Sequence, residues 1–223
     1  MVLNQIEGVF FDMDGTLLNT LDDICDSINE TLTRWGLPNK SNETLLHYIG
    51  WGAKHLCKGA TGFENEAQLE AFHKEYRQTS LNRNDPKTVA YRGIPEVVSL
   101  LKASGKKVGI YTNKPQAWTE KLAAHYFGEK VFDGIYGVRE GGALKPSPEG
   151  ITLMCAEWGI DPAKTVMIGD SPVDIETAHN AGIIGIGCTW GFRSKSQLEA
   201  AGADYLVEDA NALAQLFGLS PVF

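Results

Sequence analysis

Long apolar runs are absent from this 223-residue sequence, and no window approaches the ~20 apolar residues that span a bilayer. Basic residues are outnumbered: 20 lysines and arginines stand against 28 acids, for a formal net charge of −8. An acidic surface repels both nucleic-acid phosphates and anionic lipid heads. We therefore expect neither a nucleic acid nor a membrane as a partner, and the oligomeric state stays open.

Cysteine is also scarce, and the four cysteines form no C-x-x-C pair. Scattered cysteines are typical of reduced thiols in a cytoplasmic protein rather than of a secreted disulfide scaffold. No basic flank leads into an apolar stretch near the start, where Glu7 and Asp12 interrupt the sequence that follows Met1, so we expect no secretory signal. A G-x-G-x-x-G motif is absent as well, and the five histidines show no metal-ligand spacing. We predict a cytoplasmic protein.

The sequence does contain an alternation of short β-prone runs with helical patterns. Strands are predicted at residues 9–11, 107–111, 165–168 and 183–186, with a short apolar segment at 135–136, and helices at 94–104, 115–126, 148–158, 172–181 and 210–217. This alternation is typical of βαβ units around a parallel sheet. Between residues 18 and 88 the patterns are helical. We predict a Rossmann-like α/β core of residues 1–17 and 89–223, with a small helical cap domain, 18–88, inserted after the first strand.

Residues able to do chemistry follow the predicted strands or lie in one loop. In open parallel sheets, ligands bind beyond the carboxyl ends of the strands. We therefore expect a group of acids, a hydroxyl, an amide and a lysine to meet at one sheet edge. They are Asp12, Asp14, Thr112, Asn113, Lys145, Asp170 and Asp174.

The acids of this group predict a specific chemistry. Asp12 and Asp14 are two apart, so in an extended loop both carboxylates project to one side. When two carboxylates are held close together, repulsion raises the pKa of one of them. One then stays ionised and can act as a nucleophile, while the other carries a proton. A calcium loop is the structural alternative, but no third acid follows at the required position. Three gathered carboxylates need a cation, and their hard oxygen ligands suit Mg²⁺. Asp170 and Ser171 also have a simpler explanation as the cap of a following helix.

The order of these motifs resembles that of a known family. The run D-x-D-G-T at residues 12–16, then Thr112, Lys145 and the run G-D-S-x-x-D at 169–174 resemble, in order, the haloacid dehalogenase superfamily of phosphatases. The helical insert is similar to that superfamily's small cap. More narrowly, F-D-M-D-G-T-L at 11–17, G-W-G at 50–52, Gly182 and W-G-F at 190–192 resemble bacterial phosphoglycolate phosphatases.

The resemblance implies a role for each residue. Asp12 would attack phosphorus to form an aspartyl-phosphate, and Asp14 would act first as general acid and then as general base. Mg²⁺ would bind the Asp12 carboxylate, the Asp14 backbone carbonyl and Asp170, with Asp174 just outside its ligands. Phosphoryl oxygens would be held by Thr112 and Lys145. The residue types of Thr112 and Asn113 independently suit neutral donors to phosphoryl oxygens, with turn formation at a strand end as the alternative.

The expected activity is Mg²⁺-dependent hydrolysis of a small phosphorylated metabolite, with 2-phosphoglycolate as the favoured substrate. Sugar phosphates, nucleoside monophosphates and pyrophosphate stay open as substrates, as does phosphoryl transfer of the β-phosphoglucomutase type. A non-catalytic binding module on the same fold is the alternative from another class. In the predicted cap, Lys54 and Lys58 are four residues apart and so lie on one face if that segment is helical. They form either a solvated helix face or contacts for a substrate carboxylate.

Overall fold

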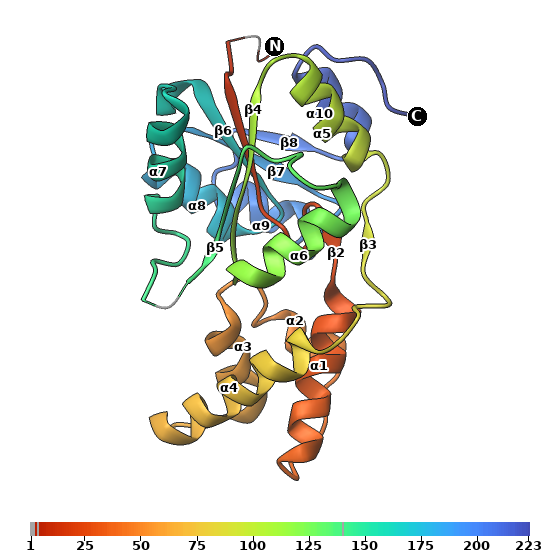
Figure 1. The fold of residues 1–223 in the computed structure, drawn as a ribbon, viewed down its shortest axis with the longest axis vertical. Coiled ribbons are helices and arrows are strands. Elements are labelled where there is room, and N and C mark those ends of the chain that lie inside the picture. Colours follow the sequence, from red (N-terminus) through yellow and green to blue (C-terminus); the bar gives the residue numbers. More distant parts are fainter. Residues whose placement is uncertain (1–2, 4, 140) are drawn as a thin grey trace. The chain divides into compact units, whose positions relative to one another are not determined.

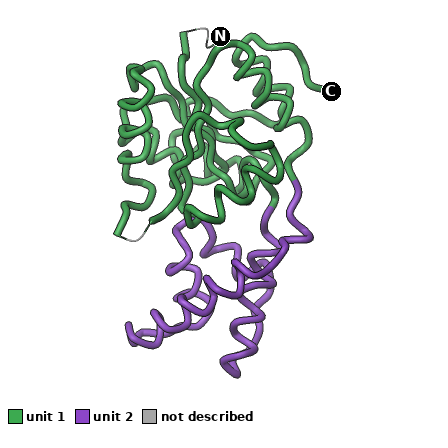
Figure 2. The backbone as a smooth tube through the Cα atoms, in the orientation of Figure 1, with its two compact units in different colours: residues 1–19, 90–223 green, residues 20–89 purple. Residues whose placement is uncertain are grey.

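The computed structural model describes residues 3, 5–139 and 141–223. The chain folds into two compact units (Figure 2): unit 1 is formed by residues 1–19 and 90–223, and unit 2 by residues 20–89. The sequence patterns placed the inserted domain at 18–88. That unit 1 is a catalytic core and unit 2 its cap stays a prediction.

A six-stranded sheet in the order β5-β4-β1-β6-β7-β8 forms the centre of unit 1 within the described residues. Every neighbouring pair in it is parallel. This confirms the Rossmann-like α/β fold that the alternating pattern predicts. The strands are β1 (Gly8–Phe11), β4 (Lys107–Pro115), β5 (Gly134–Val138), β6 (Thr165–Gly169), β7 (Ile184–Cys188) and β8 (Tyr205–Val207).

Helices cover both faces of this sheet (Figure 1). Side chains alternate along a strand, so Val9 and Phe11 of β1 join the core under α5, α6 and α10, whereas Phe10 joins the core under α7 and α8. The ring of Phe10 stacks on Trp158, with the centroids 5.2 Å apart. The helices are α5 (Ile94–Ala103), α6 (Gln116–Phe127), α7 (Glu149–Trp158), α8 (Pro172–Asn180), α9 (Lys195–Ala200) and α10 (Ala210–Leu216), with a 3₁₀ turn at Pro162–Lys164.

Unit 2 is mainly helical, with an aromatic centre. The Trp35 ring packs edge-on against Phe72 at 5.4 Å and lies 5.8 Å from Phe63. The buried Asp23 carboxylate accepts hydrogen bonds from the Thr88 backbone, the Thr88 hydroxyl and the Lys87 backbone, so it ties the first helix to the last residues of the unit. The helices are α1 (Leu21–Arg34), α2 (Asn42–Leu46), α3 (Ala53–Thr61) and α4 (Glu66–Leu81).

Several short elements differ from the sequence expectations. Residues 18–19, predicted to open the helical stretch, form strand β2 (Leu18–Asn19), which pairs with β3 (Val89–Ala90). The patterns also missed α9 and β8, which have only six and three residues, too few to show a period. The predicted strand 107–111 continues to Pro115, through an irregularity in its pairing with β5 after Tyr111. Among the described residues, no helix combines the length and apolar character needed to cross a bilayer.

Candidate active site

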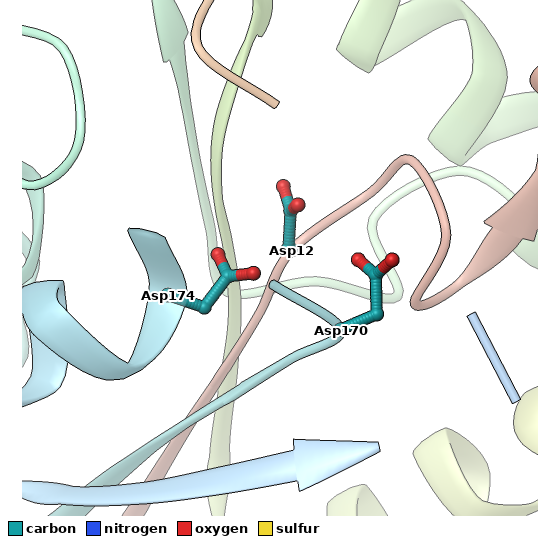
Figure 3. Close-up of side chains that lie close together, drawn as sticks. All are labelled: Asp12, Asp170 and Asp174. Carbon is teal, nitrogen blue, oxygen red and sulfur yellow. The ribbon is translucent and has the colours of Figure 1, made fainter. Parts of the chain in front are cut away.

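Asp12 and Asp170 meet because they follow neighbouring strands. Phe11 at the end of β1 is in register with Ile168 of β6, and the Asp12 backbone N–H donates to the Ile168 carbonyl at 2.9 Å. The side chain of Asp174 arrives from the first turn of α8 (Figure 3). One carboxylate oxygen from each of Asp12, Asp170 and Asp174 lies within 4.8 Å of the other two, and all three residues are buried. The sheet edge thus gathers three of the four predicted acids.

Lys145 is the cation that joins two of these acids. Its Nζ lies 2.8 Å from Asp12 Oδ1 and 2.5 Å from Asp174 Oδ1, and its side chain is 2% exposed. Burial alone would lower the pKa of this lysine, but the two carboxylates outweigh it and raise the pKa. Lys145 therefore stays charged at neutral pH, and its charge neutralises part of the acid group.

The other Asp174 oxygen is taken by the start of its own helix. Ser171 donates both its backbone N–H, at 3.0 Å, and its hydroxyl, at 2.6 Å, to Asp174 Oδ2. Ser171 is the N-cap of α8 and forms a capping box with Asp174, as expected for Ser171. With Oδ1 on Lys145 and Oδ2 on Ser171, Asp174 is placed to position the lysine.

Asp170 is fixed by two donors from separate loops. The Thr16 hydroxyl donates to Oδ1 at 3.2 Å, and the Phe192 backbone N–H donates to Oδ2 at 2.7 Å. Burial, followed by the charges of Asp174 and Asp12, raises the pKa of Asp170 to about 8. Burial also raises the pKa of Asp12 to about 6, although Lys145 acts in the opposite direction. Burial thus disfavours the ionised form of both carboxylates.

This arrangement fits a divalent cation. Asp12 Oδ1 is buried and, despite its ion pair with Lys145, has no hydrogen bond of ordinary geometry. Asp170 adds hard oxygen ligands of the kind that Mg²⁺ prefers. A cation there would stabilise the ionised forms of both Asp12 and Asp170, which burial disfavours.

Asp14 makes a contact that the sequence analysis did not foresee. Its two carboxylate oxygens lie 3.0 and 3.3 Å from Nζ of Lys114, and it is not one of the three gathered acids. The like charge that helps to raise the pKa of Asp12 is that of Asp174, whereas the sequence analysis assigned this effect to Asp14. Sequence reasoning missed Lys114 because the predicted strand ended at Tyr111. The position of Lys114 directly after Asn113 was the signal that could have identified it.

Thr112 and Asn113, near the end of β4, contact different parts of the site. Thr112 is buried and its hydroxyl lies close enough to Asp12 to lower the pKa of that carboxyl. Asn113 instead accepts the Lys145 backbone N–H at 2.7 Å and donates to the Lys145 carbonyl at 3.2 Å. Asn113, which we predicted as a phosphoryl donor, here holds the loop that carries Lys145.

The two lysines singled out in unit 2 form ion pairs within that unit. Lys54 pairs with Glu66 and, at 3.1 Å, with Glu70, while Lys58 lies 3.3 Å from Glu64. Their side chains are 44% and 52% exposed. These contacts fit the solvated helix face that the spacing allows.

Comparison with known proteins identifies the family of this chain. Residues 9–188 match the family model of haloacid dehalogenase-like hydrolases. The chain belongs to this family, which confirms the resemblance drawn from the motifs. It is an enzyme, a hydrolase of the phosphoric monoester class.

Individual relatives span nearly the whole chain. A phosphoglycolate phosphatase of Haemophilus influenzae is 28% identical over 217 residues, which cover 92% of this chain and 95% of that protein. A 5′-nucleotidase of Pseudomonas aeruginosa is also 28% identical, over 212 residues that cover 94% of each protein. The crystal structure of a predicted phosphoglycolate phosphatase from Haemophilus somnus superposes with a TM-score of 0.85 at 27% identity, covering 95% of this chain and 98% of that one.

Proposed function

We propose that this chain hydrolyses small phosphorylated metabolites with Mg²⁺ as cofactor and Asp12 as nucleophile, and that 2-phosphoglycolate is its favoured substrate. The observation that carries the proposal is the contact of Lys145 with Asp12 inside a buried acid group. A buried nucleophilic carboxylate beside a fixed cation suits attack on phosphorus, because the cation offsets charge on the transferring group.

In the first step, an Asp12 oxygen forms a bond to phosphorus while the bond from phosphorus to the ester oxygen breaks. Asp14 donates a proton to the departing oxygen. In the second step, Asp14 takes a proton from water, whose oxygen attacks the phosphorus and releases Asp12 and inorganic phosphate. Thr112 and Lys145 stabilise the phosphoryl oxygens, and Asp174 and Asn113 hold Lys145 in place.

The Asp12 and Asp170 carboxylates and the Asp14 backbone carbonyl would hold Mg²⁺. The ion would supply positive charge against the phosphoryl oxygens and favour the ionised form of Asp12. Asp174 would lie just outside the metal ligands, where it accepts from Ser171 and holds Lys145.

The substrate is supported by the relatives named phosphoglycolate phosphatase. The relative named 5′-nucleotidase keeps nucleoside monophosphates as the second candidate. Sugar phosphates, pyrophosphate and mutase-type transfer stay as further alternatives. We also propose a cytoplasmic location, which the four free and buried cysteines support.

A phosphate-release screen tests the proposal. The purified chain is given 2-phosphoglycolate, nucleoside monophosphates, sugar phosphates and pyrophosphate, with Mg²⁺ or with a chelator, and the organic product is identified to separate hydrolysis from transfer. We expect the highest kcat/KM for 2-phosphoglycolate and no release without the metal. Metal-independent release would contradict the cofactor assignment, and a preference for a nucleotide would replace the substrate.

A single variant tests the nucleophile. Asp12→Asn keeps the size of the side chain but removes the attacking charge, so both phosphate release and the trapped phosphoenzyme should disappear while the fold is retained. Turnover by a folded Asp12→Asn protein would refute the assignment.

A further inference from the structure

Lys114 is a second cation at the same sheet edge, and the proposed hydrolysis leaves it without a role. It stands near the end of β4, which lies directly beside β1 in the sheet. Its Nζ lies 3.0 and 3.3 Å from the two Asp14 oxygens, and 5.5 Å from the centre of the Trp118 ring. The lysine is thus held between an acid and an aromatic face.

Side-chain contacts direct Lys114 toward the site. The pairing of β4 with β5 is irregular between Tyr111 and Pro115, and the Lys114 backbone N–H donates to the Thr112 hydroxyl at 3.3 Å. The Lys114 side chain reaches Asp14 after β1, whereas Asn113 contacts the Lys145 backbone. Lys114 therefore meets the acid that is proposed to donate a proton to the leaving oxygen.

The two lysines differ in how firmly they are held. Lys145 is 2% exposed and contacts two acids that are themselves buried. Lys114 is 10% exposed, and Asp14, to which both of its ion-pair contacts run, is 16% exposed. Breaking the deeper pair leaves buried charges uncompensated, whereas a cation nearer the surface exchanges one anion for another at lower cost.

The position of Lys114 also matches one part of a substrate. In the proposed reaction, Asp14 contacts the ester oxygen that leaves, so a group close to Asp14 lies beside the leaving group rather than beside the phosphoryl group. In 2-phosphoglycolate, a single methylene carbon separates this ester oxygen from a carboxylate.

We propose that Lys114 binds the anionic group of the leaving portion of the substrate, a carboxylate in 2-phosphoglycolate, and so selects phosphate esters that carry a second anion near the ester oxygen. The inference rests on the proposed function. When substrate binds, Lys114 leaves Asp14 and contacts the substrate carboxylate. Asp14 then lies next to the ester oxygen and no longer pairs with Lys114.

The test compares two esters of similar size, 2-phosphoglycolate and 2-hydroxyethyl phosphate, which has a neutral hydroxymethyl group in place of the carboxylate. Removal of Lys114 alters the surroundings of Asp14 and hence the turnover of both esters, so the measured quantity is the ratio of their kcat/KM values. In Lys114→Met we expect this preference for the carboxylate to fall by at least ~10-fold, mainly through KM. Lys114→Arg should keep most of the preference, because it keeps the charge.

Lys107→Met is the matched control. It removes a lysine from the same strand, one that pairs with Asp133 at 3.2 Å, and it should leave the preference unchanged. Equal losses for both esters in Lys114→Met would mean that Lys114 only positions Asp14, and would overturn the inference. An unchanged preference would overturn it as well.

A binding measurement separates this inference from the proposed function. Calorimetry on Mg²⁺-loaded Asp12→Asn protein, with and without Lys114→Met, measures affinity for both esters without any turnover. A loss of affinity confined to 2-phosphoglycolate supports the role of Lys114 even if the wild-type chain hydrolyses neither ester. Equal affinity for the two esters, or binding of neither, overturns it.

Discussion

The replacement of Gly15 by alanine tests how closely the proposed metal site is packed. Gly15 has a φ of +86°, a region that side chains disfavour, and it lies in the loop that follows β1. A Cβ atom there would stand 2.4 Å from Asp170 Oδ2, whereas ordinary contact begins at 3.4 Å. The carboxylate would have to retreat by about 1 Å, and its bonds from Thr16 and Phe192 resist that movement.

Two separate effects follow, and their sizes differ. The left-handed backbone costs an alanine about 1–2 kcal/mol, which lowers Tm by roughly 2–8 °C for a chain of this length. Displacement of a metal-binding carboxylate from its supporting hydrogen bonds costs about 10–100-fold in metal affinity. Gly15→Ala should therefore fold, lose a few degrees of Tm, and need about 10–100 times more Mg²⁺ for half-maximal phosphate release.

Gly182→Ala isolates the first effect. Gly182 also has a positive φ, +69°, but a Cβ there would meet no atom within 4 Å. Without metal, Gly15→Ala should have the lower Tm, because its Cβ also displaces Asp170. Mg²⁺ should raise Tm at lower concentration in Gly182→Ala than in Gly15→Ala. Coincident Mg²⁺ titrations of the two variants, by activity and by Tm, would refute the contact between Gly15 and the metal-binding carboxylate.

Three further outcomes are expected. Lys145→Met should abolish activity and lower the free energy of unfolding by about 3–5 kcal/mol in denaturant titrations at pH 8, because Asp12 and Asp174 lose their shared cation; unchanged stability would contradict this. Burial raises the pKa values of Asp12 and Asp170 from 3.8 to about 6 and about 8, so the stability that they give the metal-free fold is present below pH 3.8 and lost as pH rises through 6 and 8. Mg²⁺ should therefore raise Tm more at pH 8 than at pH 6, and the reverse order would count against metal binding at these acids. Asp23→Ala should destabilise the chain by about 3–5 kcal/mol in the same titrations, since three donors lose one buried acceptor, and a loss below ~1 kcal/mol would show that this contact is not needed.

The parallel sheet was predictable because its strands are buried, short and regularly interrupted by helix-period segments. Phe11 and Ile168 end two β-prone runs that prove to be neighbours in register, which is why the residues after them meet. Strand β8 was not predictable in the same way: its three residues are too short for a period. The extent of β4 was missed because Asn113 and Pro115 are turn-forming residues that the folded sheet nevertheless accommodates.

At the candidate site, the positions of Asp12, Thr112 and Asp170 follow from the strand ends alone. The partner of each side chain does not follow, because it depends on loops that approach from distant parts of the sequence. Asn113 illustrates this limit: its residue type suits a phosphoryl donor, but both of its amide groups contact the Lys145 backbone. Asp14 illustrates it again, since its spacing from Asp12 predicted a carboxylate pair and the folded chain brings Lys114 to it instead.

The net charge of −8 argues against polyanionic partners, but it does not describe the field that a small anion meets at this sheet edge. Of the two lysines there, Lys145 is bound between Asp12 and Asp174 and is needed to hold the acid group together. Lys114 pairs with Asp14 nearer the surface, and it is the cation that we propose to discriminate among substrates. Phosphoryl binding and leaving-group selection are therefore expected to be separable by mutation, the first failing in Lys145 variants and the second in Lys114 variants.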